Sequence, residues 1–131
     1  MASRHKKVKH ISLKSLHKKA WKLQSEYIRK NSNYICFTCG AKLTKATSQA
    51  GHYIHKNCLD FDPINIHCQC VRCNRWLSGN LGIYAERLIA EYGEQAIAEL
   101  RIRSEQIKKF TIFELEGFIL TYKQKLIELE G

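Results

Sequence analysis

The chain has 131 residues and a formal net charge of +10, from 22 Lys and Arg against 12 Asp and Glu. Hydrophobic residues make up 44% of it, enough for the packed core of one domain, which excludes a disordered chain. No run approaches the ~20 apolar residues of a membrane span, and the opening lacks the apolar centre of a secretory signal, so no membrane contact is expected.

Positive charge is concentrated at the N-terminal end of the chain. Residues 1–35 hold ten Lys and Arg but one acidic residue, Glu26, whereas the remainder is close to neutral. A basic segment joined to a near-neutral body is typical of contact with a polyanion, above all nucleic acid. A solvated face or a targeting tag is the alternative interpretation.

An amphipathic helix is predicted between Ser12, as its N-cap, and a stop at Asn31. Its apolar residues recur at steps of three and four and share one face, which we expect to pack on the core. These residues are Leu13, Leu16, Ala20, Leu23 and Tyr27. The opposite face of the helix is basic. Together with three basic residues later in the chain, this face is the predicted DNA-binding surface. The predicted DNA-binding residues are Lys14, Lys18, Lys22, Arg29, Lys56, Arg72 and Arg75.

Six cysteines lie between residues 36 and 73, and four of them form two equally spaced pairs. The pairs are Cys36 with Cys39 and Cys70 with Cys73. Two such turns aim four thiolates at one point and complete the tetrahedral shell of Zn²⁺. Because protein fills all four positions, we predict one structural zinc ion per chain rather than a catalytic one. Cys58 and Cys68 are expected to be small buried side chains, with Cys68 as the alternative ligand.

Short segments surround the cysteines. Residues 50–56 and 65–70 are predicted to form the two arms of a small sheet, and a short helix is expected after Cys73, through Trp76. The fold class is therefore α+β. We expect three regions: a basic arm and helix over 1–32, a zinc-stapled core over 33–81, and a helical region over 82–131.

The region 82–131 carries three helical patterns. The first ends at Gly93 as a C-cap, the second covers residues 94–104, and the third follows a capping box of Thr111 and Glu114. The third helix has a broad apolar face, which is either the interface of a homodimer or packs on its own chain. The residues of that face are Ile112, Leu115, Phe118, Ile119, Tyr122 and Leu126.

The order of His52, Asn65 and Asn74, interleaved with the cysteine pairs, resembles the HNH nucleases, also called ββα-metal or His-Me finger nucleases. The words AGHY at 50–53, NIH at 65–67 and SGN at 78–80 are similar to the phage NinG family, also called Rap, as is the tail with EYGEQAIAEL and FTIFEL. The resemblance covers about residues 33–131. It implies a small zinc-stapled ββα-metal core with a basic N-terminal helix and C-terminal helices.

The resemblance also implies an activity: a metal-dependent endonuclease that cleaves branched recombination intermediates such as Holliday junctions or D-loops, leaving 5′-phosphate and 3′-hydroxyl ends. It implies a phage protein in the host cytoplasm, with phage recombination proteins as partners. Because a four-way junction has approximate two-fold symmetry, a homodimer suits that substrate.

Roles for three residues follow from the same resemblance. His52 is the expected general base, Asn74 the ligand of one catalytic Mg²⁺ or Mn²⁺, and Asn65 the residue that holds the connecting loop. Many HNH enzymes place an acid or histidine before the base, whereas this chain has Gly51 there. Either the cation has one protein ligand, or another side chain reaches it. The candidates are His67, which we favour, His55 and Asn80.

Several alternatives stay open at this point. One alternative is that His52 itself binds the cation and the base lies elsewhere. Another is that any of these histidines is structural. For the chain as a whole there are two alternative functions. It is either a non-catalytic zinc-containing DNA-binding accessory protein in phage recombination, or an HNH endonuclease that acts on ordinary duplex DNA. Cleavage of branched DNA by the chain in the presence of a divalent cation would distinguish an enzyme from a non-catalytic DNA-binding protein.

Overall fold

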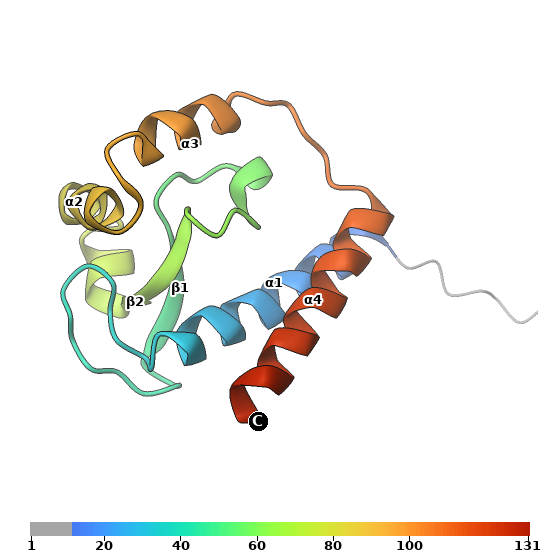
Figure 1. The fold of residues 1–131 in the computed structure, drawn as a ribbon, viewed down its shortest axis with the longest axis horizontal. Helices are drawn as coiled ribbons and strands as arrows, with labels where there is room; N and C mark the ends of the chain where they lie inside the picture. The colour runs from blue at the N-terminus through green and yellow to red at the C-terminus, as the bar shows by residue number, and fades with distance from the viewer. Residues whose placement is uncertain (1–11) are drawn as a thin grey trace, which may run out of the picture.

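The structure is a computed structural model that describes residues 12–131. A two-stranded sheet lies between a pair formed by the first and last helices and the two helices that follow the sheet (Figure 1). The elements in order are α1 (Leu13–Asn31), β1 (Ser48–His52), a 3₁₀ turn η1 (Asn57–Leu59), β2 (Ile66–Cys70), a π-helical turn η2 (Arg72–Trp76), α2 (Leu81–Tyr92), α3 (Ala96–Ser104) and α4 (Ile112–Glu130). The predicted α+β class is confirmed. Four bases of the predicted arm, Arg4, Lys6, Lys7 and Lys9, lie outside the described residues.

The prediction for α1 is confirmed at both ends. The Ser12 hydroxyl accepts a hydrogen bond from the Ser15 N–H at 3.0 Å, and the helix ends at Asn31. Its buried face differs from the predicted one, because Leu13 is half exposed while the polar Gln24 is fully buried. The Gln24 amide donates to the backbone oxygen of Asp60 at 2.6 Å and accepts from the Tyr122 hydroxyl at 3.1 Å, so its burial leaves no polar group unpaired.

Helix α4 packs along α1, as the blue and red helices in Figure 1 show. The predicted capping box is confirmed: Thr111 and Glu114 exchange side-chain to backbone hydrogen bonds. Buried Leu115 and Ile119 meet α1 and Phe61 in one apolar cluster. The apolar face of α4 therefore packs on its own chain. A different stripe of α4, spaced by seven residues, is exposed: Phe113, Leu120 and Ile127.

The strands β1 and β2 are antiparallel, with Gly51 opposite His67 and His52 opposite Ile66. The predicted first arm, residues 50–56, was wrong at both ends, because β1 begins at Ser48 and stops at His52. The chain turns after His52 because the side chain of Asn65 takes the place of a strand partner. Its amide oxygen accepts from the Ile54 N–H at 2.8 Å, and its amide nitrogen donates to the Ile54 oxygen at 2.9 Å.

Helices α2 and α3 cover the opposite side of the sheet from α4. Gly93, with a φ of 98°, ends α2 as predicted, since a residue with a side chain is strained at that angle. Tyr84, Leu88 and Leu100 form a second apolar cluster with Leu59. Within residues 12–131, no helix has the combination of length and apolar character that crossing a membrane requires.

Candidate functional site

Four cysteine sulfurs converge between the loop after α1 and the turn η2. The sulfurs of Cys36, Cys39, Cys70 and Cys73 lie within 4.8 Å of one another, and in residues 12–131 this is the one such group of metal-ligating side chains. A backbone bridge between Ile35 and Lys42 closes the first turn. In the second turn, the Cys73 N–H donates to the Cys70 sulfur at 3.4 Å. The arrangement fits the tetrahedral thiolate shell that zinc prefers.

The charges of this cluster favour a bound cation. Burial raises the pKa of Cys39 to about 12 and also raises the pKa of Cys70. Burial alone raises the pKa of Cys36 too, but hydrogen bonds from the Thr38 hydroxyl and nearby backbone N–H groups outweigh it and lower the pKa to about 6. Four thiolates this close repel one another, and a divalent cation that replaces their protons removes the repulsion.

His52 lies in a hydrogen-bonded chain of three side chains. Its Nε2 is 3.0 Å from Asp60 Oδ1, and Asp60 Oδ2 is 3.0 Å from His17 Nε2. The Asp60 side chain is 13% exposed, so its carboxylate is shielded from water while it bridges the two imidazoles. A carboxylate in this position fixes the orientation and the tautomer of a histidine, as a general base requires. The sequence did not single out Asp60 or His17.

Helix α1 builds this arrangement from one face. The indole of Trp21 stacks on the His52 ring, with the centroids 4.8 Å apart and the planes 2° from parallel. Four residues before it His17 binds the Asp60 carboxylate, and three residues after it Gln24 binds the Asp60 backbone. The spacing of four and three residues on a helix is the one signal in the sequence that these side chains act together.

Asn65 holds the connection between the strands, as predicted from the resemblance to HNH nucleases. Its side chain is fully buried and makes three hydrogen bonds to backbone groups of Ile54 and Leu59. These bonds fix the turn that follows His52 and therefore the direction of the His52 side chain. Asn65 has no solvent-accessible oxygen or nitrogen left for substrate.

Asn74 lies on the other side of β1 from the His52 ring. Its Nδ2 donates to Gln49 Oε1 at 2.8 Å, and its Oδ1 accepts no hydrogen bond from the described residues. Gln49 and Gly51 share one face of β1, whereas His52 points to the α1 face. The structure therefore places His52 and Asn74 on the two sides of the end of β1 rather than in contact. A free amide oxygen fits a hard cation such as Mg²⁺.

Two of the three candidate second ligands, His67 and Asn80, bind other groups. His67 stacks on Phe37, and its two ring nitrogens lie 3.1 Å from the Tyr84 hydroxyl and 2.8 Å from the Tyr92 hydroxyl. Burial lowers the pKa of His67 to about 4, so the ring is neutral near pH 7. Asn80 donates to the Cys73 sulfur at 3.6 Å and so supports the cysteine cluster. With both its nitrogens engaged, His67 has no free nitrogen to offer a cation.

His55 also differs from its expectation. On a regular strand it would face away from His52, but the strand stops at His52 and the two ring centroids are 5.1 Å apart. Cys68 is buried and outside the sulfur cluster, as expected for a small apolar side chain. Cys58 is partly buried, and its thiol lies 3.6 Å from the Ser104 carbonyl oxygen.

Six of the seven predicted DNA-binding residues are exposed, and two of them line a groove beside the His52 site. The groove encloses about 660 Å³, and we call it the lysine groove. Its polar and aromatic lining residues are Lys14, His17, Lys18, Trp21, Asn57, Lys108, Lys109 and Phe110. Lys108 and Lys109, from the segment between α3 and α4, were not predicted. The seventh residue, Arg29, instead donates to Lys45 O and Ser25 O and ties α1 to the chain before β1.

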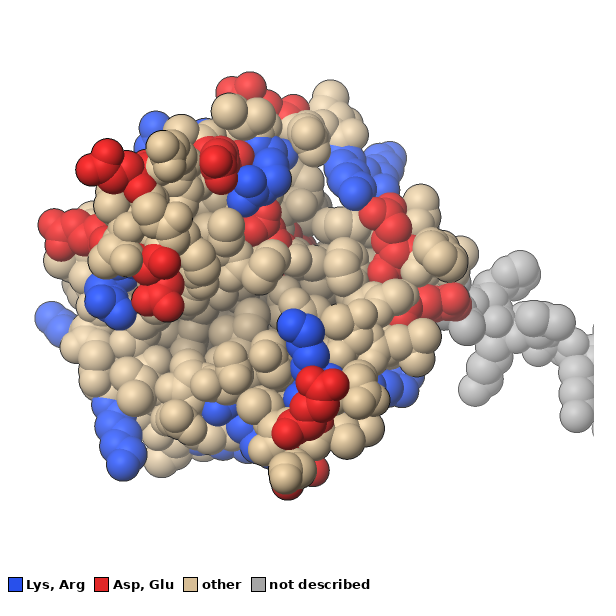
Figure 2. Space-filling model, viewed as in Figure 1, with Lys and Arg blue, Asp and Glu red and all other residues tan. Residues whose placement is uncertain are grey.

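Acidic and basic side chains both occur on each half of the face drawn in Figure 2. Acidic side chains gather over α2 and α3 in Figure 2, while basic side chains stand along the segment that leads into α4.

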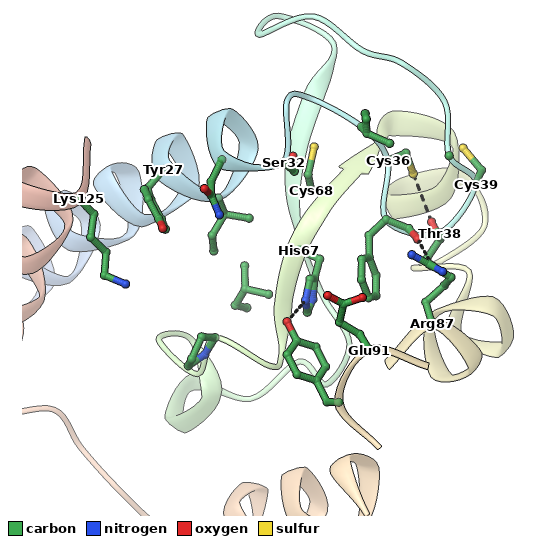
Figure 3. A pocket seen from close by; sticks show the side chains of 18 of the residues that line it. Tyr27, Ser32, Cys36, Thr38, Cys39, His67, Cys68, Arg87, Glu91 and Lys125 are labelled. Atoms are coloured by element: carbon green, nitrogen blue, oxygen red, sulfur yellow. Dashed lines mark hydrogen bonds between the residues drawn. The ribbon is translucent and has the colours of Figure 1, made fainter. Parts of the chain in front are cut away.

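A second cleft, of about 770 Å³, lies away from His52, between the end of α1, the first cysteine turn and α2. Figure 3 shows His67 facing into it from β2, with Arg87 and Glu91 of α2 opposite. Arg87 donates to the backbone oxygen of Phe37 at 3.2 Å and lies over the Phe37 ring. These contacts hold α2 against the first cysteine turn.

Comparison with known proteins gives a consistent result. A family model described as the bacteriophage lambda NinG protein matches residues 1–131. The NinG protein of Escherichia phage lambda is 36% identical over 118 residues, which cover 87% of this chain and 57% of that protein. The NinG protein of Salmonella phage P22 is 36% identical over 116 residues, 86% of this chain and 56% of that protein. The chain thus spans less than three fifths of the length of these phage relatives.

One further relative comes from a bacterium. The Zorya protein ZorE of Escherichia coli is 34% identical over 88 residues, which cover 66% of this chain and 22% of that protein. No solved structure gives a significant match to the chain.

Proposed function

This chain belongs to the family of the bacteriophage lambda NinG protein, and from that premise we propose that it is a metal-dependent DNA endonuclease with an HNH-type core, acting on branched recombination intermediates such as Holliday junctions or D-loops. The observation that carries the proposal is the His52–Asp60 pair at the edge of the lysine groove. It combines a candidate general base with a surface that attracts phosphate.

The chemistry follows from the orientation of the His52 ring. When Nε2–H donates to the Asp60 carboxylate, the lone pair of Nδ1 is free to take a proton from a water molecule. The resulting hydroxide attacks the phosphorus of the scissile linkage. The Asp60 carboxylate stabilises the imidazolium that forms. The bond between phosphorus and the 3′-oxygen breaks opposite to the attacking oxygen, and the 3′-oxygen takes a proton from a water molecule, giving the 5′-phosphate and 3′-hydroxyl ends.

A bound Mg²⁺ or Mn²⁺ would supply positive charge that stabilises the leaving oxygen and the phosphate. Asn74 is the proposed ligand through Oδ1. Asn65 keeps the loop after His52 in place, and Trp21 holds the His52 ring plane. The four cysteines would hold one zinc ion in a structural role, because four thiolates would leave no coordination position open for water.

The proposal is tested by incubating the purified chain with a matched set of junction, flap, loop and linear DNA in Mg²⁺. We expect nicking of branched substrates, no cleavage in EDTA, and recovery when Mg²⁺ or Mn²⁺ is added in excess. Binding of branched DNA without cutting in any divalent cation would identify an accessory DNA-binding protein instead. Equal cutting of linear duplex would remove the selectivity for branched DNA.

The lysine groove makes a separate prediction about DNA binding. If its four lysines neutralise phosphates, replacing Lys108 and Lys109 by alanine should reduce the slope of log K against log salt by about 2. The measurement is a salt titration of binding by fluorescence anisotropy. Matched controls are the exposed Lys42 and Lys123, which lie outside the groove and should leave the slope unchanged when both become alanine. Equal slopes for the two double variants would place DNA elsewhere.

A homodimer is also part of the proposal, because a four-way junction offers two equivalent strands. The exposed stripe of Phe113, Leu120 and Ile127 on α4 is the surface it would use, since the buried face of α4 is already occupied by α1. Phage recombination proteins are further proposed partners, on the ground of the family alone.

A further inference from the structure

One tryptophan stands in solvent at the end of η2. Trp76 is 80% exposed, and within residues 12–131 no aromatic ring stacks on its indole and no Lys or Arg lies over it. The other tryptophan of the chain, Trp21, is stacked on an imidazole instead. Large apolar side chains gathered in one exposed stretch indicate a surface that a partner covers. Three more of them belong to the stretch around Trp76: Val71, Leu77 and Leu81.

The second cysteine turn holds Trp76 in a fixed place. Cys73, within η2, belongs to the sulfur cluster. The Leu77 N–H donates to the Arg72 oxygen at 2.8 Å, which closes the backbone over the turn. The Gly79 N–H donates to the Cys73 oxygen at 2.9 Å and closes it a second time. Because the backbone is already ordered, a partner has only the two side-chain torsions of Trp76 to fix, so the entropic cost of the contact is small.

Two arginines give the same turn a positive charge. Arg72 and Arg75 are exposed, and no carboxylate of residues 12–131 forms an ion pair with either of them. The chain has no Asp or Glu between residues 63 and 85. We call Arg72, Arg75 and Trp76 the tryptophan turn. A partner that suits it combines negative charge with a flat apolar face, and nucleic acid offers both in its phosphates and bases.

The tryptophan turn borders the proposed cleavage site. Asn74, the proposed cation ligand, lies in the same turn, between the two arginines in the sequence. A Cβ at Gly79, just after the turn, would lie 3.9 Å from the backbone oxygen of His52. A DNA strand bound at His52 and Asn74 would therefore pass beside Trp76.

We propose that Trp76 stacks on a DNA base that has lost a stacking neighbour, while Arg72 and Arg75 bind the phosphates beside that base. The inference rests on the proposed function, because the DNA is the same branched substrate, and it names the feature of that DNA which the chain recognises. In a continuous duplex, neighbouring base pairs cover both faces of each base. At a branch point, flap or loop, a base face is open, and every base has such a face, so the contact selects DNA structure rather than sequence.

The first test follows the fluorescence of Trp76 and needs no cleavage. Trp21→Phe leaves Trp76 as the one tryptophan of the chain, and this zinc-loaded variant is titrated with DNA without added Mg²⁺. A base stacked on an indole quenches the emission of that indole. We therefore expect strong quenching by flap and single-stranded DNA, and weak quenching by linear duplex of the same sequence.

The second test measures the affinity of variants for dye-labelled flap and linear DNA by fluorescence anisotropy. Trp76→Leu keeps an apolar side chain without an aromatic face, so it should bind flap DNA about tenfold more weakly and linear duplex within about twofold of the wild type. Trp76→Phe should recover part of the loss. Replacing both Arg72 and Arg75 by glutamine should weaken binding of the two DNAs equally and reduce the salt slope by about 2.

The matched control is Ile102→Ala, which removes an apolar side chain that is 66% exposed on α3, away from the tryptophan turn. It should bind both DNAs as the wild type does. Zinc content and circular dichroism report whether each variant is folded, and the fluorescence titration keeps Trp76 itself in place.

The outcomes separate this inference from the proposed function. Quenching and tenfold weaker flap binding in Trp76→Leu, in a chain that cuts no DNA with Mg²⁺, support the stacking contact and overturn the nuclease. Wild-type flap affinity in Trp76→Leu overturns the stacking contact and leaves the nuclease intact. Equal loss of flap and duplex binding also overturns it, since Trp76 is then a general DNA contact. Absence of quenching by every DNA overturns it and assigns the tryptophan turn to a protein partner.

Discussion

Removal of zinc should unfold the centre of the molecule, with loss of the β-sheet and of the packing of α2. Zinc bound by four thiolates contributes on the order of 10 kcal/mol to folding, whereas a whole domain is stable by about 5–15 kcal/mol. The cluster joins the loop before β1 to the end of β2 and to η2, and the hydrogen bonds of Gln69 to Thr38 and Gly79 are a weaker second link between the same segments. We expect thermal unfolding of the zinc-loaded chain to be cooperative and the chelated chain to lack that transition.

The matched comparison for this prediction is between two cysteines. Cys39→Ser removes a ligand at the surface and should lower both zinc content and the melting temperature sharply. Cys58→Ser changes a partly buried thiol outside the cluster and should retain one zinc per chain with a small change in stability. Zinc is counted by a metal-sensitive dye after denaturation. Full zinc content in Cys39→Ser would show that the cluster is not the zinc site.

The parts of the fold that the sequence predicted correctly are those fixed by local chemistry. Ser12, Gly93 and the Thr111–Glu114 box mark helix ends through bonds to residues three or four positions away, so short windows contain all the information. The cysteine pairs are similar, because each CxxC turn is local and the two turns can satisfy their ligand preference together. The convergence of the four sulfurs on one point could therefore be predicted without knowledge of the rest of the fold.

The parts it missed depend on contacts between distant segments. Asp60 acquires its role because His17, forty-three residues earlier, and His52 bind its two oxygens. His67 looked like a metal ligand from its position in the chain, but Tyr84 and Tyr92 of α2 occupy both its nitrogens. The early end of β1 follows from a side chain, Asn65, that replaces backbone pairing. None of these partners lies within one turn or one strand of the residue it controls.

The place of α1 in the site changes how its basic composition is understood. The sequence favoured an arm whose charge meets DNA, with its apolar face as packing. In the structure the same helix carries His17, Trp21 and Gln24, which position Asp60 and the His52 ring. Its lysines at positions 14 and 18 stand beside them in the lysine groove. Under the proposed function, phosphate attraction and orientation of the base would therefore come from neighbouring turns of one helix.

Replacing His52 by alanine should abolish DNA cleavage while leaving DNA binding nearly unchanged. General base catalysis contributes about 10²–10⁴ in rate, and the ring provides no charge that attracts phosphate when it is neutral. His52→Asn is the better-matched variant, since its amide can still donate to Asp60 but cannot take a proton at neutral pH. We expect both variants to cut branched DNA at least a hundredfold more slowly, with dissociation constants within about twofold of the wild type.

Two further variants determine whether the loss comes from the base itself. Asp60→Asn removes the charge that orients the ring and should slow cleavage less than His52→Asn does, by about tenfold. His55→Ala removes the neighbouring imidazole, whose ring lies 5.1 Å away, and should cut at close to the wild-type rate. Added imidazole should restore part of the activity of His52→Gly, because a free base can enter the space beside Trp21. Cleavage at the wild-type rate by His52→Asn would show that the proton is taken by another group.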